Sequence, residues 1–228
     1  MASSLDDLPV LDHHEDARKR MVDSQIRPNK VTDPRILGAM RSLPRERFLP
    51  ASLDALAYSD EDVPLGDGRF LMEPMVLARL LQIAEPREGE RALVVAAGTG
   101  YGAAVLSQCG PTVTALEESR PLLDLAGPVL RAEAPEVTLA TGRLDAGWPS
   151  GAPYDVILIE GAVRDIPPAI AAQLRPATGR LVAVLAGPGR TNQAVLVEAT
   201  PAGLRAQPMF DCATPSLPSL LPAPSFVF

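Results

Sequence analysis

The chain has 228 residues, a formal net charge of −7 and a sequence pI near 4.9, and 46% of its residues are hydrophobic. This length suits one generous α/β domain, and the apolar fraction excludes wholesale disorder. The acidic balance argues against a protein that binds nucleic acid by neutralising phosphates. No apolar run approaches the roughly 18 residues of a membrane span, and the acidic N-terminus is unlike a secretory signal. Two cysteines without metal or redox spacing complete the prediction of a cytoplasmic protein.

Histidine is nearly absent from the chain. His13 and His14 are the only two: His13 ends residues 1–13, which we predict to be a mobile tail, and His14 follows it. Ser-His-Asp and Cys-His catalysis both need a histidine base held in the core, and the common catalytic zinc sites use two or three histidines. The sequence therefore predicts neither a histidine-based nucleophile nor a metal site.

Residues 14–90 are predicted to form an N-terminal helical segment followed by an acidic loop. Apolar residues recur at helical spacing between residues 14 and 43, and Thr32-Asp33-Pro34 is typical of a helix start. Residues 58–73 are rich in Asp, Glu, Gly and Pro, which predicts a long loop. Pro74 then opens an apolar helix that continues to Ala84.

Residues 91–200 are predicted to form an α/β core, because short apolar runs alternate with helical patterns. This alternation is typical of a doubly wound, mostly parallel sheet. Residues 194–199 resemble a further strand, and residues 201–228 predict an antiparallel edge with a Pro-rich tail docked by Phe210, Phe226 and Phe228. The predicted core strands are 92–96, 112–116, 137–140, 154–159 and 180–185, and the helices between them are 101–108, 121–133 and 167–174.

A glycine turn joins the first core strand to the helix after it. Gly98, Gly100 and Gly102 let the backbone approach a ligand closely, and the helix start offers free N–H donors. Glu117 ends the second strand, where a carboxylate accepts both hydroxyls of an adenosine ribose. The pattern predicts a nucleoside-containing cofactor. The alternative is a tight turn with no ligand and a solvated Glu117.

Two cofactors fit this turn. Gly98, Gly100 and Ala103 match the dinucleotide pattern G-x-G-x-x-A, which indicates a nicotinamide-dependent oxidoreductase. About 90 residues precede the first core strand, however, and the sheet is predicted to end in an antiparallel edge. Both features favour an S-adenosylmethionine-dependent methyltransferase.

Several segments resemble the protein-L-isoaspartate O-methyltransferases, over about residues 20–186. The resemblance implies a class I methyltransferase fold with a seven-stranded sheet. It also implies S-adenosyl-L-methionine as cofactor and methyl transfer to the carboxylate of an isoaspartyl-containing peptide or protein, or of another carboxylate acceptor. Such a carboxylate is already a nucleophile, so the reaction needs positioning and desolvation rather than a base. The segments that carry the resemblance are 21–26, 33–40, 44–50, 57–60, 100–106, 147–149, 152–155, 166–174 and 179–182.

The glycine turn, the strand ends and the resemblance together give the candidate site residues. Asp60, in the acidic loop, and Glu73, close to the expected methyl group, are the catalytic candidates, although the sequence favours the interpretation of Glu73 as an acid in the first turn of a helix. Glu160 either approaches the sulfonium or caps its strand. The candidate cofactor-binding residues are Gly98, Thr99, Gly100, Tyr101, Gly102, Glu117, Arg143, Leu144 and Glu160.

Four positions depart from the family pattern. Phe70 and Met72 replace a Thr and a Ser, Val94 replaces an acid before the first glycine, and Arg143 replaces an acid expected near the adenine. Each lost charged hydrogen bond costs on the order of 1.5–3 kcal/mol. The sequence thus favours a divergent methyltransferase of the isoaspartyl-repair type. A non-catalytic scaffold or binding protein with a degenerate methyltransferase fold is the second hypothesis, and the oxidoreductase is the third.

Overall fold

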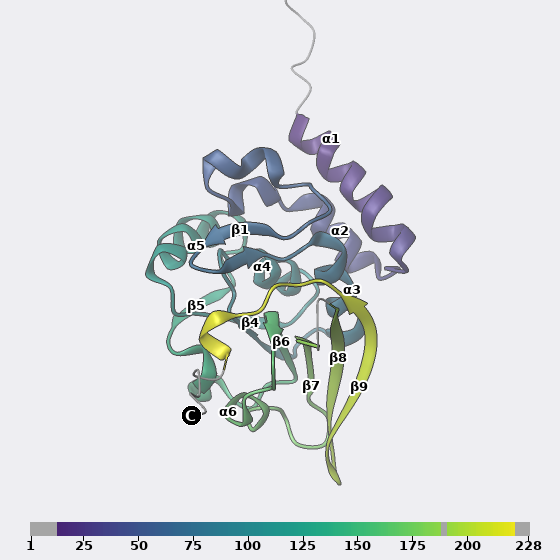
Figure 1. Ribbon diagram of the computed structural model, residues 1–228, viewed down its shortest axis with the longest axis vertical. Helices are drawn as coiled ribbons and strands as arrows, with labels where there is room; N and C mark the ends of the chain where they lie inside the picture. Colours follow the sequence, from purple (N-terminus) through teal and green to yellow (C-terminus); the bar gives the residue numbers. More distant parts are fainter. Residues whose placement is uncertain (1–12, 188–190, 222–228) are drawn as a thin grey trace, which may run out of the picture.

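The computed structural model describes residues 13–187 and 191–221 (Figure 1). Two sheets form its framework, one with seven strands and one with two. None of the helices in these two stretches is both long and apolar enough to cross a membrane.

The seven-stranded sheet has the order β5-β4-β3-β6-β7-β8-β9. Its first five strands pair in parallel, and β8 and β9 add an antiparallel edge. The predicted doubly wound sheet with an antiparallel C-terminal edge is therefore confirmed. The strands are β3 (Arg91–Val95), β4 (Thr112–Glu117), β5 (Thr138–Thr141), β6 (Val156–Val163), β7 (Arg180–Leu185), β8 (Asn192–Thr200) and β9 (Gly203–Cys212).

Alternate residues of the central strands pack into two separate hydrophobic cores, one on each face of the sheet. In β3, Ala92 and Val94 pack toward the N-terminal helices, whereas Leu93 and Val95 pack toward the opposite face. This period of two is the pleat of a strand buried on both sides. The helices are α1 (His13–Arg20), α2 (Pro34–Ser42), α3 (Pro74–Ala84), α4 (Tyr101–Ser107), α5 (Arg120–Glu133) and α6 (Pro168–Ala171), with a π-helical turn at Met21–Ile26 and short 3-10 turns at Arg27–Asn29, Arg45–Phe48, Ala51–Leu56, Leu144–Ala146, Pro149–Gly151 and Pro218–Leu220.

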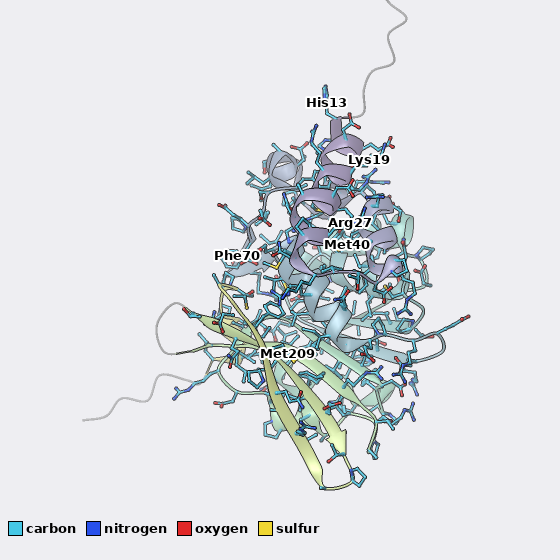
Figure 2. All side chains as sticks on the ribbon, turned by 90° about the vertical axis from the view of Figure 1, so that its right-hand side faces the viewer. His13, Lys19, Arg27, Met40, Phe70 and Met209 are labelled. Atoms are coloured by element: carbon cyan, nitrogen blue, oxygen red, sulfur yellow. The ribbon has the colours of Figure 1, made fainter. Side chains whose placement is uncertain are left out.

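The N-terminal helices stand at one end of the molecule. The predicted helix start is confirmed, since the Asp33 carboxylate accepts from the backbone N–H of Arg35 (2.9 Å) and Pro34 opens α2. Helix α1 begins at His13, so the last residue of the predicted tail is helical, while residues 1–12 lie outside the described residues. Figure 2 places His13 at the outer tip of α1, away from the sheet.

The predicted loop over residues 58–73 is wrong in part, because it contains a β-hairpin. Strand β1 (Val63–Gly66) pairs antiparallel with β2 (Arg69–Leu71). Asp67 and Gly68 connect them with φ of 51° and 70°. Positive φ at both central residues defines the type I′ turn, for which Asp-Gly is a preferred sequence.

Two further elements differ from prediction in length. Strand β6 continues to Val163, so Glu160 lies inside it, with a register irregularity between Leu158 and Ala162. Helix α6 has only four residues. Phe210 of β9 lies beneath the guanidinium of Arg79 in α3 (3.7 Å to the ring centroid), whereas Phe226 and Phe228 lie outside the described residues.

After β9 the chain turns back along the sheet. The segment that follows, drawn in yellow in Figure 1, crosses in front of β6 and β4 towards β5. Backbone hydrogen bonds fix it to β6: Ala162 N–H donates to Pro215 O (2.9 Å) and Leu217 N–H donates to Ala162 O (2.8 Å). We call residues 213–218 the C-terminal strap.

Candidate functional site

The glycine turn lies where the sequence predicts it, between β3 and α4. Gly98 and Gly100 have φ of 58° and 94°, conformations that suit glycine. A Cβ on Gly100 would come within 2.9 Å of the Leu130 side chain, so a larger residue does not fit. Ala96, just before the turn, also has positive φ (62°), a conformation that costs an alanine roughly 1–2 kcal/mol.

Glu117 ends β4 beside this turn and is fully buried. The N–H of Gly98 donates to Oε2 (2.8 Å), and the N–H groups of Glu118 and Ser119 donate to Oε1 (2.9 Å each). The predicted turn and the predicted acid are therefore in direct contact. The alternative of a solvated Glu117 is wrong, because burial and backbone donors fix the carboxylate against the turn.

Arg69 fills the remaining space at this carboxylate. Its Nη1 and Nη2 donate to Glu117 Oε1 and Oε2, each at 2.8 Å, and Nη2 also donates to Ala96 O (2.8 Å). Only 4% of the Arg69 side chain is exposed, against 0% for Glu117. The two carboxylate oxygens of Glu117 thus accept five hydrogen bonds. A carboxylate has roughly four lone-pair positions, so none is left for another donor.

The hairpin β1–β2 is what aims Arg69 inward. Along β2 Arg69 and Leu71 are buried and Phe70, between them, is half-buried, as the alternation of a strand requires. Phe70 therefore lies on the other face of the hairpin from Arg69. In Figure 2 it lies near the upper ends of β8 and β9.

Glu160 closes the turn from the side of β6. A Cβ on Gly102 would collide with the Glu160 carboxylate, so this acid lies directly against the start of α4. Burial raises the pKa of Glu160 to about 8, although the positive charges of Arg69 and Arg45 oppose that rise. Its Oε1 has no hydrogen-bond partner among the described residues. Glu160 is thus a buried acid rather than a strand cap.

The C-terminal strap covers the same crevice. Leu217 is buried, and a Cβ on Gly161 would meet its side chain at 2.5 Å. A Cβ on Gly68, in the hairpin turn, would likewise come within 2.6 Å of the Pro218 side chain. The cavity left between the hairpin, β6 and the strap measures about 10 Å³, which is room for about one water molecule.

The two catalytic candidates lie outside this closed crevice, in a small acidic group. The backbone N–H of Glu73 donates to Asp62 Oδ1 (2.9 Å). Burial, with the neighbouring charges of Asp60 and Asp62, raises the pKa of Glu73 to about 7. Asp60 is exposed. A half-buried carboxyl with a pKa near neutrality suits proton transfer.

The remaining candidates divide between surface and core. Arg143 is 79% exposed and pairs with Asp145 (2.6 Å), and its neighbour Leu144 is fully buried. The carboxylate of Asp145 is therefore engaged by Arg143. Thr99 and Tyr101 are both fully buried, and the guanidinium of Arg45 stacks 4.7 Å from the centroid of the Tyr101 ring.

Two of the residues that depart from the family pattern, Val94 and Met72, are buried in the core. Val94 is fully buried in β3 and packs into the apolar core. Met72 is 2% exposed, and its backbone carbonyl accepts from Arg45 Nη2 (2.8 Å). Neither position offers a side-chain hydrogen bond to a ligand.

Arg69 is a residue of the candidate site that the sequence did not predict. It stands 48 positions before Glu117, in a segment predicted as loop. The Asp67-Gly68 dipeptide between two short apolar runs was the available signal, since it predicts a hairpin. A hairpin would have placed Arg69 on the same face as buried Leu71, although not against Glu117.

Comparison with known proteins places this architecture in a family. A family model described as "Protein-L-isoaspartate(D-aspartate) O-methyltransferase (PCMT)" matches residues 16–204. The chain belongs to the protein-L-isoaspartate O-methyltransferase family. The protein of that name from Methylorubrum extorquens is 42% identical over 181 residues, which cover 79% of this chain and 78% of the relative. The predicted resemblance is confirmed.

Other family members agree in sequence and in fold. The relative named "Protein-L-isoaspartate O-methyltransferase 1" from Rhodopseudomonas palustris is 40% identical over 72% of this chain and 67% of its own. A solved structure with the family name superposes with a TM-score of 0.75 at 24% identity, covering 90% of this chain and 67% of the other. A Plasmodium falciparum structure named for the same family, in complex with S-adenosyl-L-homocysteine, gives 0.72 at 17% identity, covering 89% and 98%.

In this conformation the site does not fit an adenosyl cofactor. A ribose diol would need to donate to Glu117, but both carboxylate oxygens are already taken by Arg69 and by backbone N–H groups. Glu160 lies against Gly102 and Leu217 against Gly161, so the space beside the turn is filled by side chains of the protein. The family fold and the acid are present, and the crevice between them is closed.

Proposed function

We propose that this protein is an S-adenosylmethionine-dependent O-methyltransferase of the isoaspartyl-repair type, whose crevice is closed in the conformation described. The substrate is an isoaspartyl-containing peptide or protein. Membership of the family over residues 16–204 is the observation that carries the proposal. Glu117, buried against the glycine turn at the carboxyl end of β4, supports it, because ligands of open α/β sheets bind at that edge.

The chemistry of the chain agrees with an isoaspartyl carboxylate as acceptor. The reaction needs no histidine base, and the two histidines, His13 and His14, lie in α1. An ionised carboxylate attacks without prior deprotonation, so orientation and exclusion of water supply the acceleration. The carboxyls of Asp60 and Glu73, beside the hairpin, are candidates for orienting the peptide.

The test is transfer of radioactive methyl from S-adenosylmethionine to a synthetic peptide containing one isoaspartyl residue. The matched control is the same peptide with ordinary aspartate, which presents a carboxylate one bond removed from that geometry. Methylation of the isoaspartyl peptide alone supports the proposal. Equal labelling of both peptides, or of neither, contradicts it.

A second candidate function follows from the ion pair between Arg69 and Glu117. A chain that has permanently replaced its ribose contact with an internal arginine is a binding or scaffold protein on the methyltransferase fold. Under that reading S-adenosylhomocysteine does not bind at millimolar concentration to the native chain or to any variant of Arg69. The nicotinamide alternative predicts heat on titration with NAD instead, so calorimetry with these ligands separates all three functions.

A further inference from the structure

We propose that Arg69 is an internal occupant of the ribose subsite, which an adenosyl ligand must displace from Glu117 in order to bind. The inference rests on the proposed function for the identity of the ligand. It adds a competition within the chain itself: the cofactor and a side chain 48 residues before Glu117 compete for one carboxylate.

Arg69 contacts Glu117 in the same way that a ribose would. A guanidinium presents two parallel N–H donors, and Arg69 aims both at Glu117, one per oxygen, at 2.8 Å. A ribose presents two neighbouring O–H donors to the same two acceptors. Both sets cannot be satisfied at once, because the backbone N–H groups of Gly98, Glu118 and Ser119 already use the remaining acceptor positions.

The hairpin that carries Arg69 is separate from the central sheet. Strands β1 and β2 have four and three residues and form a sheet of their own, unpaired with the seven-stranded sheet. Two-stranded hairpins of this size are marginally stable by themselves. The turn residues Gly66, Asp67 and Gly68 are exposed. Displacement therefore breaks no strand pairing of the central sheet.

Arg69 is also incompletely satisfied where it lies. Its Nε, buried with the rest of the side chain, has no hydrogen-bond partner among the described residues. Glu160, on the other side of the crevice, leaves Oε1 without one as well. Unpaired buried polar atoms are costly, so the closed arrangement is less stable than its two short ion-pair contacts suggest.

The consequence is a measurable loss of apparent affinity. When the binding-competent state is only a fraction of the population, the apparent dissociation constant rises by the inverse of that fraction. Weakening the contact between Arg69 and Glu117 enlarges the open fraction. It should therefore tighten the binding of S-adenosylhomocysteine by about tenfold or more.

The experiment is calorimetric titration of S-adenosylhomocysteine into the native chain, Arg69→Gln and Arg69→Lys. Gln removes the charge and the bidentate fork; Lys keeps a charge opposite Glu117 and so protects the fold while losing the fork. Arg87→Gln is the matched control, since it removes one arginine charge at an exposed pair with Glu85. Folding of each variant is checked by its thermal transition.

Tighter binding by the folded Arg69 variants, with Arg87→Gln equal to the native chain, supports the proposal. Unchanged or weaker binding by a folded Arg69 variant overturns it. If both variants fail to fold, amide exchange of the native chain decides. Faster exchange in residues 63–73 with millimolar S-adenosylhomocysteine shows the displacement, and unchanged or slower exchange there overturns the proposal.

These results are separable from a failure of the proposed function. If Arg69→Gln binds the ligand more tightly but the isoaspartyl peptide is not methylated, the proposed competition for Glu117 is supported and the proposed repair activity is contradicted. If the native chain methylates the peptide and all variants bind S-adenosylhomocysteine with equal affinity, the repair activity is supported and the proposed competition is contradicted.

Discussion

The two ends of the central sheet differ in how they are packed. At the carboxyl end, Arg69 is paired with Glu117, and the cavity between the hairpin, β6 and the strap measures only about 10 Å³. Near the start of β7, α6 and the turn between β8 and β9 enclose an open pocket of about 540 Å³. That pocket is lined by apolar and small residues, among them Leu174, Ala199 and Leu204, and by no titratable side chain.

This contrast shows that the larger of these two hollows and the candidate site are different places. Pocket size reflects loose apolar packing, whereas chemistry needs convergent polar groups with perturbed environments. Such groups gather at the closed end, in Arg69, Glu117 and Glu160. The structure therefore places an ion pair and a buried acid at the end of the sheet where open α/β sheets bind ligands.

The largest expected effect is on the ion pair that closes the crevice. Glu117→Ala leaves Arg69 buried without its carboxylate and three backbone N–H groups without an acceptor. Removing one partner of a buried pair costs about 3–5 kcal/mol. Urea denaturation should show this loss in the free energy of unfolding.

The matched control is Asp145→Ala, which removes the carboxylate of an exposed pair with Arg143. Exposed pairs contribute about 0–1 kcal/mol, so this variant should stay close to the native chain. Equal losses of unfolding free energy in the two variants would contradict the claim that the buried pair contributes more to stability than the exposed pair.

The next effect is a dependence of stability on pH, from Glu160. Burial raises its pKa in the folded chain to about 8, from an unfolded value of about 4.5. A carboxyl with a raised pKa stabilises the fold fully below its unfolded pKa, and this contribution is lost as the pH rises through about 8. The loss between pH 5 and 9 is on the order of 4 kcal/mol.

Thermal unfolding across this range measures that slope. Glu160→Gln should flatten it and leave a smaller dependence from Glu73, whose pKa is raised to about 7. Substitution of Gln for the exposed Glu61 serves as the control and should leave the slope in place. A native chain whose transition temperature rises from pH 5 to 9 would contradict the burial of Glu160.

The smallest effect compares one leucine from each end. Leu217→Ala removes a buried side chain over Gly161 and should cost about 2–3 kcal/mol, the lower part of the range for a buried leucine. Leu204→Ala changes a side chain that is 56% exposed and should alter stability by less than about 0.5 kcal/mol. Chemical denaturation of both variants gives the comparison, and equal losses would show that the strap packs no tighter than the open pocket.

The parts of the fold predicted from sequence are those with a local signal. The run from Ala92 to Ala96 indicated β3 because parallel strands buried on both faces are continuously apolar. Asp33 indicated the start of α2 because its side chain caps the helix two residues later. The length of β6 was missed, since Glu160 and Gly161 interrupt the apolar run in sequence while the backbone continues to Val163.

The sequence by itself determined the sheet, the glycine turn and Glu117 at the strand end beside it, because each follows from spacing within a few residues. Only the tertiary structure decided that Arg69 reaches Glu117, that Glu160 lies against Gly102 and that Leu217 covers Gly161. The physical reason is distance along the chain. The partners stand 48, 58 and 56 residues apart, and packing, rather than any local pattern, fixes which charges and apolar groups meet.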